Sequence, residues 1–168
     1  MDSLQDGILS LALTASEAAQ KLGVVTKDAE AWAEQNRQCD ELLGVWSNRH
    51  NAFVYPPFQL DSSVQLERLT QLLRILSTRT GFDPIQDDRG GWGRAYWLHQ
   101  PHAQLSEAAL RAIDLAQEDP VALSVTLSAL DDTARAPAEV FVNHPNVVIT
   151  MAADLAMATR ATRPLEGL

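Results

Sequence analysis

Two histidines, His99 and His102, have the spacing that comes closest to metal chemistry. Side chains three positions apart on a helix share one face, so two imidazole rings placed there can reach one ion. Pro101 interrupts the helix between them, and neither a cysteine nor a carboxylate lies close in sequence. We therefore expect no metal site at this pair.

The segment from Gly81 to Gly91 has a composition that could suit a cation or a phosphate. Asp83, Asp87 and Asp88 supply carboxylates, but the ligand spacing and the terminal glutamate of a calcium loop are missing. The run Gly90-Gly91-Trp92-Gly93 follows no predicted strand and lacks the Lys-Ser or Lys-Thr pair of a phosphate loop. We interpret the acidic run as a solvated loop and the glycines as a flexible lead into an aromatic helix.

The sequence carries no signature of a catalytic nucleophile. No serine stands in a Gly-x-Ser-x-Gly elbow, and Cys39 has no histidine close in sequence. Cys39 is also the single cysteine, which excludes an intramolecular disulfide and argues against a cysteine zinc site. We expect a protein that is not an enzyme and needs no cofactor.

Apolar periodicity and capping residues predict a mostly α protein with one short β-hairpin. The hairpin is expected from strand-like runs at 42–47 and 52–55, joined by the turn formers of 48–51. Thr14 and Glu17 form a predicted capping box, Thr26 is the next expected cap, and Ser62 or Ser63 the one after that. Helices are expected over 3–13, 16–22, 26–38, from 62 or 63 to about 76, then over 92–100, 106–117, 120–130, 137–142 and 145–159.

These elements predict two small helical domains joined by the hairpin. Residues 1–44 form an N-terminal domain of helix-turn-helix type, and 45–61 form the hairpin and a connector. Residues 62–160 form a C-terminal helical domain, and 161–168 form a frayed tail. No run of apolar residues approaches the length that spans a bilayer, and acids stand where a secretory signal carries cations. We therefore expect a cytoplasmic protein.

The helix-turn-helix interpretation rests on spacing near the N-terminus. Ala19 is a small residue where two helices would cross, Gly23 suits the turn, and Ala29 and Trp32 would anchor the second helix. The alternative is a helical hairpin that only packs.

Lys27, Arg37 and Arg49 are the residues that could contact DNA from this domain. The surrounding charge is unfavourable, because residues 1–61 carry four basic and nine acidic side chains. The whole chain has a net charge of −9, with 13 Lys and Arg against 22 Asp and Glu. This balance argues against a general affinity for nucleic acid or for an anionic membrane.

Several short runs, taken in order, resemble one family. They are Ser16–Val24, Leu43-Gly44-Val45, the stretch Phe53–Asp61 with its Tyr-Pro-Pro-Phe-Gln core, and Trp92–Leu105. In this order they resemble the antitoxins of the Xre/MbcA/ParS group, which partner toxins of the RES-domain and related types. A looser match at Arg135–Phe141 follows about thirty additional residues.

The resemblance implies a non-enzymatic protein that neutralises a cognate toxin by covering its active site. It also implies that the N-terminal domain dimerises or binds operator DNA, so that the protein regulates its own promoter. Aromatic residues dominate the energetics of protein interfaces. Trp92, Tyr96 and His99 are therefore the candidate contacts for the toxin, whereas Phe58 and Trp97 are expected in the core.

Two other functions remain open on the sequence. One is a DNA-binding transcriptional regulator that uses Lys27, Arg37 and Arg49. The other is an acidic adaptor or chaperone that uses the C-terminal helices and has no toxin partner.

Overall fold

The computed structural model describes residues 2–111 and 133–161 and is predominantly helical, with one two-stranded antiparallel hairpin. This confirms the predicted class. Residues 107–111 are also helical. The bounded elements, in chain order, are α1 (Asp2–Leu11), α2 (Ala15–Lys21), α3 (Ala29–Gln38), β1 (Val45–Ser47), β2 (Ala52–Val54), η1 (Pro57–Leu60), α4 (Leu66–Ser77), α5 (Trp92–His99), η2 (Ala103–Leu105), α8 (Pro137–Phe141) and α9 (Pro145–Ala161).

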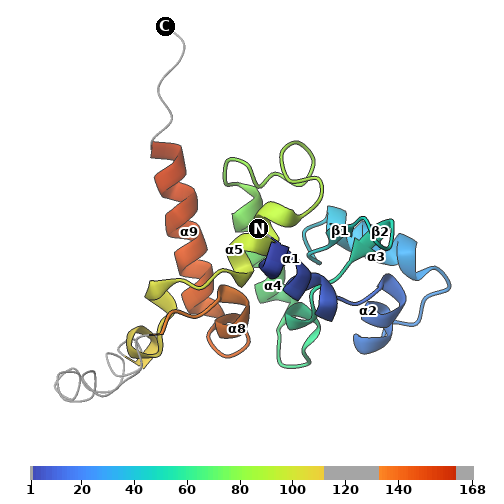
Figure 1. Ribbon diagram of the computed structural model, residues 1–168, viewed down its shortest axis with the longest axis horizontal. Coiled ribbons are helices and arrows are strands. Elements are labelled where there is room, and N and C mark those ends of the chain that lie inside the picture. Colours follow the sequence, from blue (N-terminus) through green and yellow to red (C-terminus); the bar gives the residue numbers. More distant parts are fainter. Residues whose placement is uncertain (1, 112–132, 162–168) are drawn as a thin grey trace, which may run out of the picture.

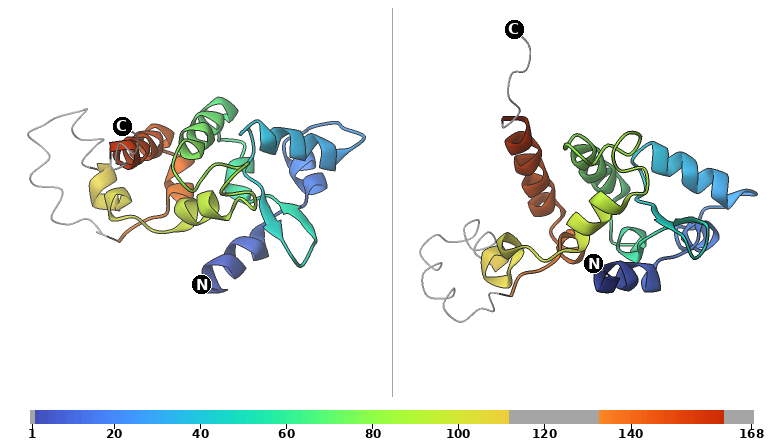
Figure 2. Two further views of the ribbon diagram at one scale, coloured as in Figure 1. Left: turned by 90° about the horizontal axis from the view of Figure 1, so that it is seen from above. Right: turned by 45° about the horizontal axis from the view of Figure 1, so that its top comes forward.

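The main core is built around α4, which packs along α9 (Figures 1 and 2). Leucines recur along α4 with helical spacing, so one face of the helix is apolar and buried. Helix α5 crosses the same core and contacts both α8 and α1. The fully buried leucines of α4 are Leu69, Leu72, Leu73 and Leu76.

A second, smaller core holds α2 against α3. Ala18 and Ala33 are fully buried there, together with Leu42, Tyr55 and Leu60 from the segments that follow. Burial raises the pKa of Tyr55 to about 12. Helix α1 was predicted to belong to an N-terminal domain of residues 1–44. In the structure it contributes Ile8 to the main core and contacts α5. The amphipathic face of α1 therefore belongs with the C-terminal helices.

The local signals at the helix starts were correct at one position and wrong at two. The capping box at Thr14 and Glu17 is present and begins α2. Helix α3 begins later than predicted, because Asp28, not Thr26, accepts the first-turn N–H bond, from Ala31. Neither Ser62 nor Ser63 caps α4, which begins at Leu66.

The connector after the hairpin is fixed by one buried amide. Gln59 accepts a hydrogen bond from the backbone N–H of Leu43 and donates to its carbonyl, both at 2.7 Å. The side chain thus replaces a missing strand partner for Leu43. This explains the place of glutamine in the Tyr-Pro-Pro-Phe-Gln stretch.

The predicted helices of the C-terminal part have different outcomes. Those at 137–142 and 145–159 correspond to α8 and α9. Residues 107–111 of the helix predicted over 106–117 are helical, whereas 112–117 and the helix predicted over 120–130 lie outside the described residues. Within the described chain, no helix is long and apolar enough to cross a membrane.

Candidate protein-binding site

The hairpin presents two aromatic rings on its outer side. Trp46 and Phe53 are paired across the strands, with ring centroids 5.3 Å apart and the planes nearly perpendicular. Along β1 the neighbours Val45 and Ser47 are buried, whereas Trp46 is 36% exposed. Alternation along a strand forces this arrangement, and the edge-to-face pair stabilises it.

The loop before α5 adds a third aromatic ring. The backbone N–H of Trp46 donates to Gly90 at 2.8 Å, and the indole N–H of Trp92 donates to the carbonyl of Trp46 at 3.0 Å. Gly91 makes this approach possible, since its φ of 72° lies in the left-handed region. The loop therefore runs beside β1 and brings the start of α5 next to the hairpin.

Together these side chains surround an open hollow of about 510 Å³. We call Trp46, Phe53, Trp92 and Arg89 the aromatic surface. Gln5 of α1, Asn48 and Gly90 complete its lining. Rings that are partly exposed beside an arginine are the composition found at the centres of protein interfaces.

The chain matches no family model, no curated protein and no solved structure. Its function must therefore be argued from its own surfaces.

The structure places the sequence-predicted contacts in different settings. Tyr96 belongs with the aromatic surface, because its ring lies 5.5 Å from that of Trp92 and its hydroxyl donates to Gln5 at 3.5 Å. His99 lies elsewhere, edge-on to Phe58, with its Nδ1 2.9 Å from the carbonyl of Ala95. Trp97 is 5% exposed, which confirms its assignment to the core.

Sequence reasoning missed Trp46, Phe53 and Arg89 as part of this surface. The period-two alternation around Trp46, with apolar and small neighbours on both sides, was the signal that points it outward. Nothing local marks Arg89, whose place depends on the fold of the loop.

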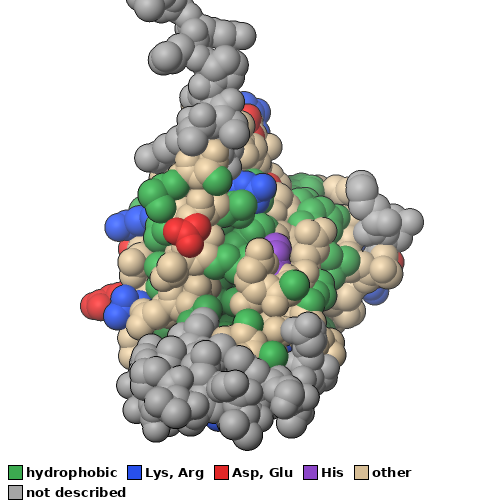
Figure 3. All heavy atoms as spheres, turned by 90° about the vertical axis from the view of Figure 1, so that its left-hand side faces the viewer, with side chains coloured by type: hydrophobic (Ala, Val, Ile, Leu, Met, Phe, Trp, Pro, Cys, Tyr) green, Lys and Arg blue, Asp and Glu red, His purple; other side chains and the backbone are tan. Residues whose placement is uncertain are grey.

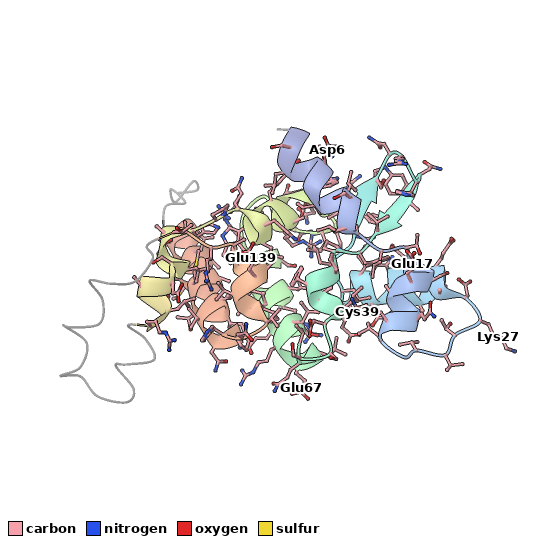
Figure 4. The ribbon with its side chains drawn as sticks, turned by 60° about the horizontal axis from the view of Figure 1, so that its bottom comes forward. Asp6, Glu17, Lys27, Cys39, Glu67 and Glu139 are labelled. Atoms are coloured by element: carbon pink, nitrogen blue, oxygen red, sulfur yellow. The ribbon has the colours of Figure 1, made fainter. Side chains whose placement is uncertain are left out.

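The three DNA candidates do not form one cationic site. Arg37 is 9% exposed, binds both carboxylate oxygens of Glu34 at 2.7 Å, and stacks 4.0 Å from the centre of Phe53. Its hydrogen bonds lower the pKa of Glu34. Lys27 projects from the connection between α2 and α3 (Figure 4), whereas Arg49 lies exposed in the hairpin turn. The charge of Arg37 is therefore paired with Glu34 and is not available to DNA.

The acidic loop is more ordered in its contacts than predicted. Asp88 is 6% exposed, which corrects its interpretation as part of a solvated run. Its carboxylate accepts bonds from the backbone of Gly93 and from the guanidinium of Arg94, and these offset the cost of burial. Asp83 accepts backbone bonds from Ile85 and Gln86 and so shapes the turn.

The histidine pair is also engaged with the backbone. His102 Nε2 lies 3.2 Å from the carbonyl of Trp97, and His99 Nδ1 lies 2.9 Å from the carbonyl of Ala95. Within residues 2–111 and 133–161, no three His, Cys, Asp or Glu side chains gather in a way that could hold a metal ion. Cys39 lies at the end of α3 and is exposed.

The half-buried His99 predicts acid sensitivity. Burial lowers the pKa of His99, while its bond to Ala95 and the charge of Glu139 oppose that change. The unfolded chain thus binds this proton at a higher pH than the folded chain, so stability falls as pH drops through the ordinary histidine range. We expect His99→Asn to reduce the loss of stability between about pH 7.5 and about pH 5, measured by urea unfolding.

The matched control is His50→Asn, which changes an exposed histidine of the hairpin turn. Comparison with the His50 variant shows how much of the change comes from the particular setting of His99 and how much from losing any histidine. An unchanged slope in the His99 variant would show that other groups carry the acid sensitivity.

Proposed function

We propose that the chain is a non-enzymatic binding protein of the antitoxin type, which neutralises a cognate toxin by covering its active site. The observation that carries this proposal is the aromatic surface, where Trp46, Phe53 and Trp92 surround a hollow beside Arg89. Large rings that are already held by cross-strand packing and hydrogen bonds lose little freedom on binding. A preformed anchor of this kind suits a protein whose task is to bind another protein.

The charge of the chain supports a partner with a basic cleft. The net charge is −9, and residues 1–61 and 106–168 each contribute −5, whereas residues 62–105 carry +1. Attraction between opposite charges steers an acidic protein toward a cationic cleft, and this raises the rate of association. The antitoxin resemblance of the Tyr-Pro-Pro-Phe-Gln stretch points to the same class of partner.

The proposal treats α2 and α3, the predicted helix-turn-helix, as a packed helical hairpin. The two helices contact each other, Ala18 and Ala33 share their core, and Gly23 takes a left-handed conformation after α2. The connection spans residues 22–28 and is longer than the short turn of DNA-reading pairs. With Arg37 engaged by Glu34, we assign this hairpin to packing and not to recognition of DNA.

Co-expression with the product of the adjacent gene tests the proposal. The wild-type chain should restore growth to cells that make this product and should co-purify with it. Trp46→Ala should weaken the complex by more than about tenfold, because truncating a central aromatic contact costs about 2 kcal/mol or more. Binding can be measured by titration calorimetry of the purified pair.

Val25→Ala is the matched control, because Val25 is a fully exposed apolar residue on the connection between α2 and α3. It should leave the affinity unchanged. The proposal fails if the wild-type chain neither binds nor neutralises the neighbouring product, or if Trp46→Ala binds as tightly as Val25→Ala.

A further inference from the structure

Helix α9 has apolar side chains both on its buried face and beside it. Its inner face is buried against the core through Val148, Ile149, Ala152 and Ala156. On its other side Val147 and Met151 are half-buried, and Met157 is 61% exposed. Between Pro145 and Ala158 the only charged residue is Asp154. Asn146, Thr150 and Asp154 also lie on this exposed side, so apolar and polar side chains alternate along it.

The exposed side of α9, with Val147 and Met151 between Asn146, Thr150 and Asp154, forms one wall of a groove. The opposite wall comes from His102, Gln104 and Leu105, in and next to η2, and the groove has a volume of about 720 Å³. Figure 3 shows the hydrophobic side chains gathered on this side of the molecule, with few charged ones among them. Val147 and Met151 lie along the floor with helical spacing, so the groove follows the helix axis.

A half-buried cation stands at one end of this groove. Arg79 follows α4 and lines a hollow of about 370 Å³ that shares His102 and Leu155 with the groove. Its guanidinium lies 4.4 Å from the centre of the Phe82 ring, and burial lowers its pKa. Within the described part of the chain, no carboxylate lies within ion-pair distance of Arg79. A cation in such a setting is stabilised by an incoming carboxylate.

We propose that the groove holds α9 of a second copy of this chain, antiparallel to the first, with Asp154 of each copy paired to Arg79 of the other. The apolar part of the groove and the half-buried cation beside it suit a helix with apolar side chains and a carboxylate, and α9 has both. Asp154 is exposed and lines the groove, and no cation pairs with it among the described residues. One face then supplies both the helix and the cation, as a two-fold interface requires.

The placement of α9 fits this dimer. The helix has 17 residues, and its C-terminal part stands away from the rest of the molecule (Figures 1 and 2). The exposed Met157 lies on this projecting part, where a second copy can cover it. The hairpin that carries Trp46 and Phe53 of the aromatic surface lies far from α9 in both figures, so the dimer leaves these rings open. The inference goes beyond the proposed function and does not depend on it.

Sedimentation equilibrium of the full chain, with paired charge reversals, tests the dimer. The wild type should have twice the 18.4 kDa mass of one chain. Asp154→Arg and Arg79→Asp should each raise the dissociation constant by more than about tenfold, because each places like charges together in the interface. The double variant should restore the pair in reversed order and recover most of the affinity.

Charge changes of equal size elsewhere serve as controls. Glu67→Arg changes an exposed residue in the first turn of α4, and Lys27→Asp changes an exposed residue in the connection between α2 and α3 (Figure 4). Neither should affect dimerisation. Circular dichroism shows whether Arg79→Asp folds. If that variant does not fold, Asp154→Asn replaces it as the test, because it is nearly isosteric and should also raise the dissociation constant of the dimer. A monomeric wild type, or a dimer that both single reversals leave intact, would overturn the proposal.

Discussion

Replacing Arg94 by methionine is expected to destabilise the protein by about 3–5 kcal/mol, the cost of leaving buried charges without a partner. The Arg94 side chain is fully buried. Its Nε donates to Asp88 at 3.1 Å and its Nη1 to Asp40 at 3.0 Å. Methionine can fill much of the space, but it leaves two carboxylates facing an apolar site.

This loss should be large because Arg94 joins three parts of the fold. Asp88 belongs to the loop before α5, and Asp40 lies at the turn after α3. Asp40 also accepts a hydrogen bond from Ser77 at the end of α4. Removing the guanidinium therefore loosens the loop, the turn and two helix ends at once.

Urea unfolding measures the effect, and two amide variants divide it. Asp40→Asn keeps the left-handed backbone at φ 56°, which asparagine tolerates, so it removes only charge. Its effect should be smaller than that of Asp88→Asn, because the Asp40 side chain is 16% exposed and that of Asp88 is 5% exposed. Combining both amides with Arg94→Met should recover part of the lost stability. A loss below about 1 kcal/mol for Arg94→Met would mean that the three groups behave as a surface pair.

The same group shows where sequence reasoning stopped. Asp88 and Arg94 are close in sequence, so a contact between them could be considered from the sequence. Asp40, the other partner of Arg94, is far upstream. A local pattern cannot show that a distant carboxylate will neutralise an arginine. The loop was therefore interpreted as solvated, although Asp88 is buried in it. Long-range pairing decides burial here, and no spacing rule contains that information.

The elements themselves were more predictable, because their causes are local. The leucine spacing of α4, the box at Thr14 and Glu17, and the turn formers between β1 and β2 each act within a few residues. The exact starts of α3 and α4 were not predictable in the same way. At α3 two neighbouring cap residues compete, and Asp28 takes the cap while Thr26 accepts its N–H bond.

The candidate site was predicted only in part, again for physical reasons. Trp92 and Tyr96 were selected from the sequence, and they lie together. Trp46 and Phe53 join them because the hairpin register pairs these two rings and the loop carries Trp92 to the carbonyl of Trp46. His99 has the same helical spacing but faces Phe58 and the core side of α5. Spacing thus placed the residues on one helix and could not state which neighbours would cover them.

Gly91→Ala should be the most damaging of the glycine substitutions, at about 3 kcal/mol or more, because overlap with fixed backbone adds to the backbone strain. A methyl group on Gly91 would overlap the carbonyl oxygen of Gly44 and would lie 3.1 Å from its carbon. This neighbour is backbone, so it cannot move away as a side chain can. Relief requires β1 to move from the loop, which breaks the bonds that join Trp46 to Gly90 and Trp92 to Trp46.

Two other glycines separate the overlap from the strain. Gly23 and Gly81 also have positive φ, at 68° and 82°, but nothing lies within 4 Å of an added methyl group. Their alanine variants should lose only about 1–2 kcal/mol, the cost of the left-handed conformation. Thermal unfolding measures all three, and tryptophan fluorescence of the folded Gly91 variant should report the displaced rings. If the three variants were equally stable, the close approach of loop and strand would contribute nothing, and the aromatic surface would not depend on it.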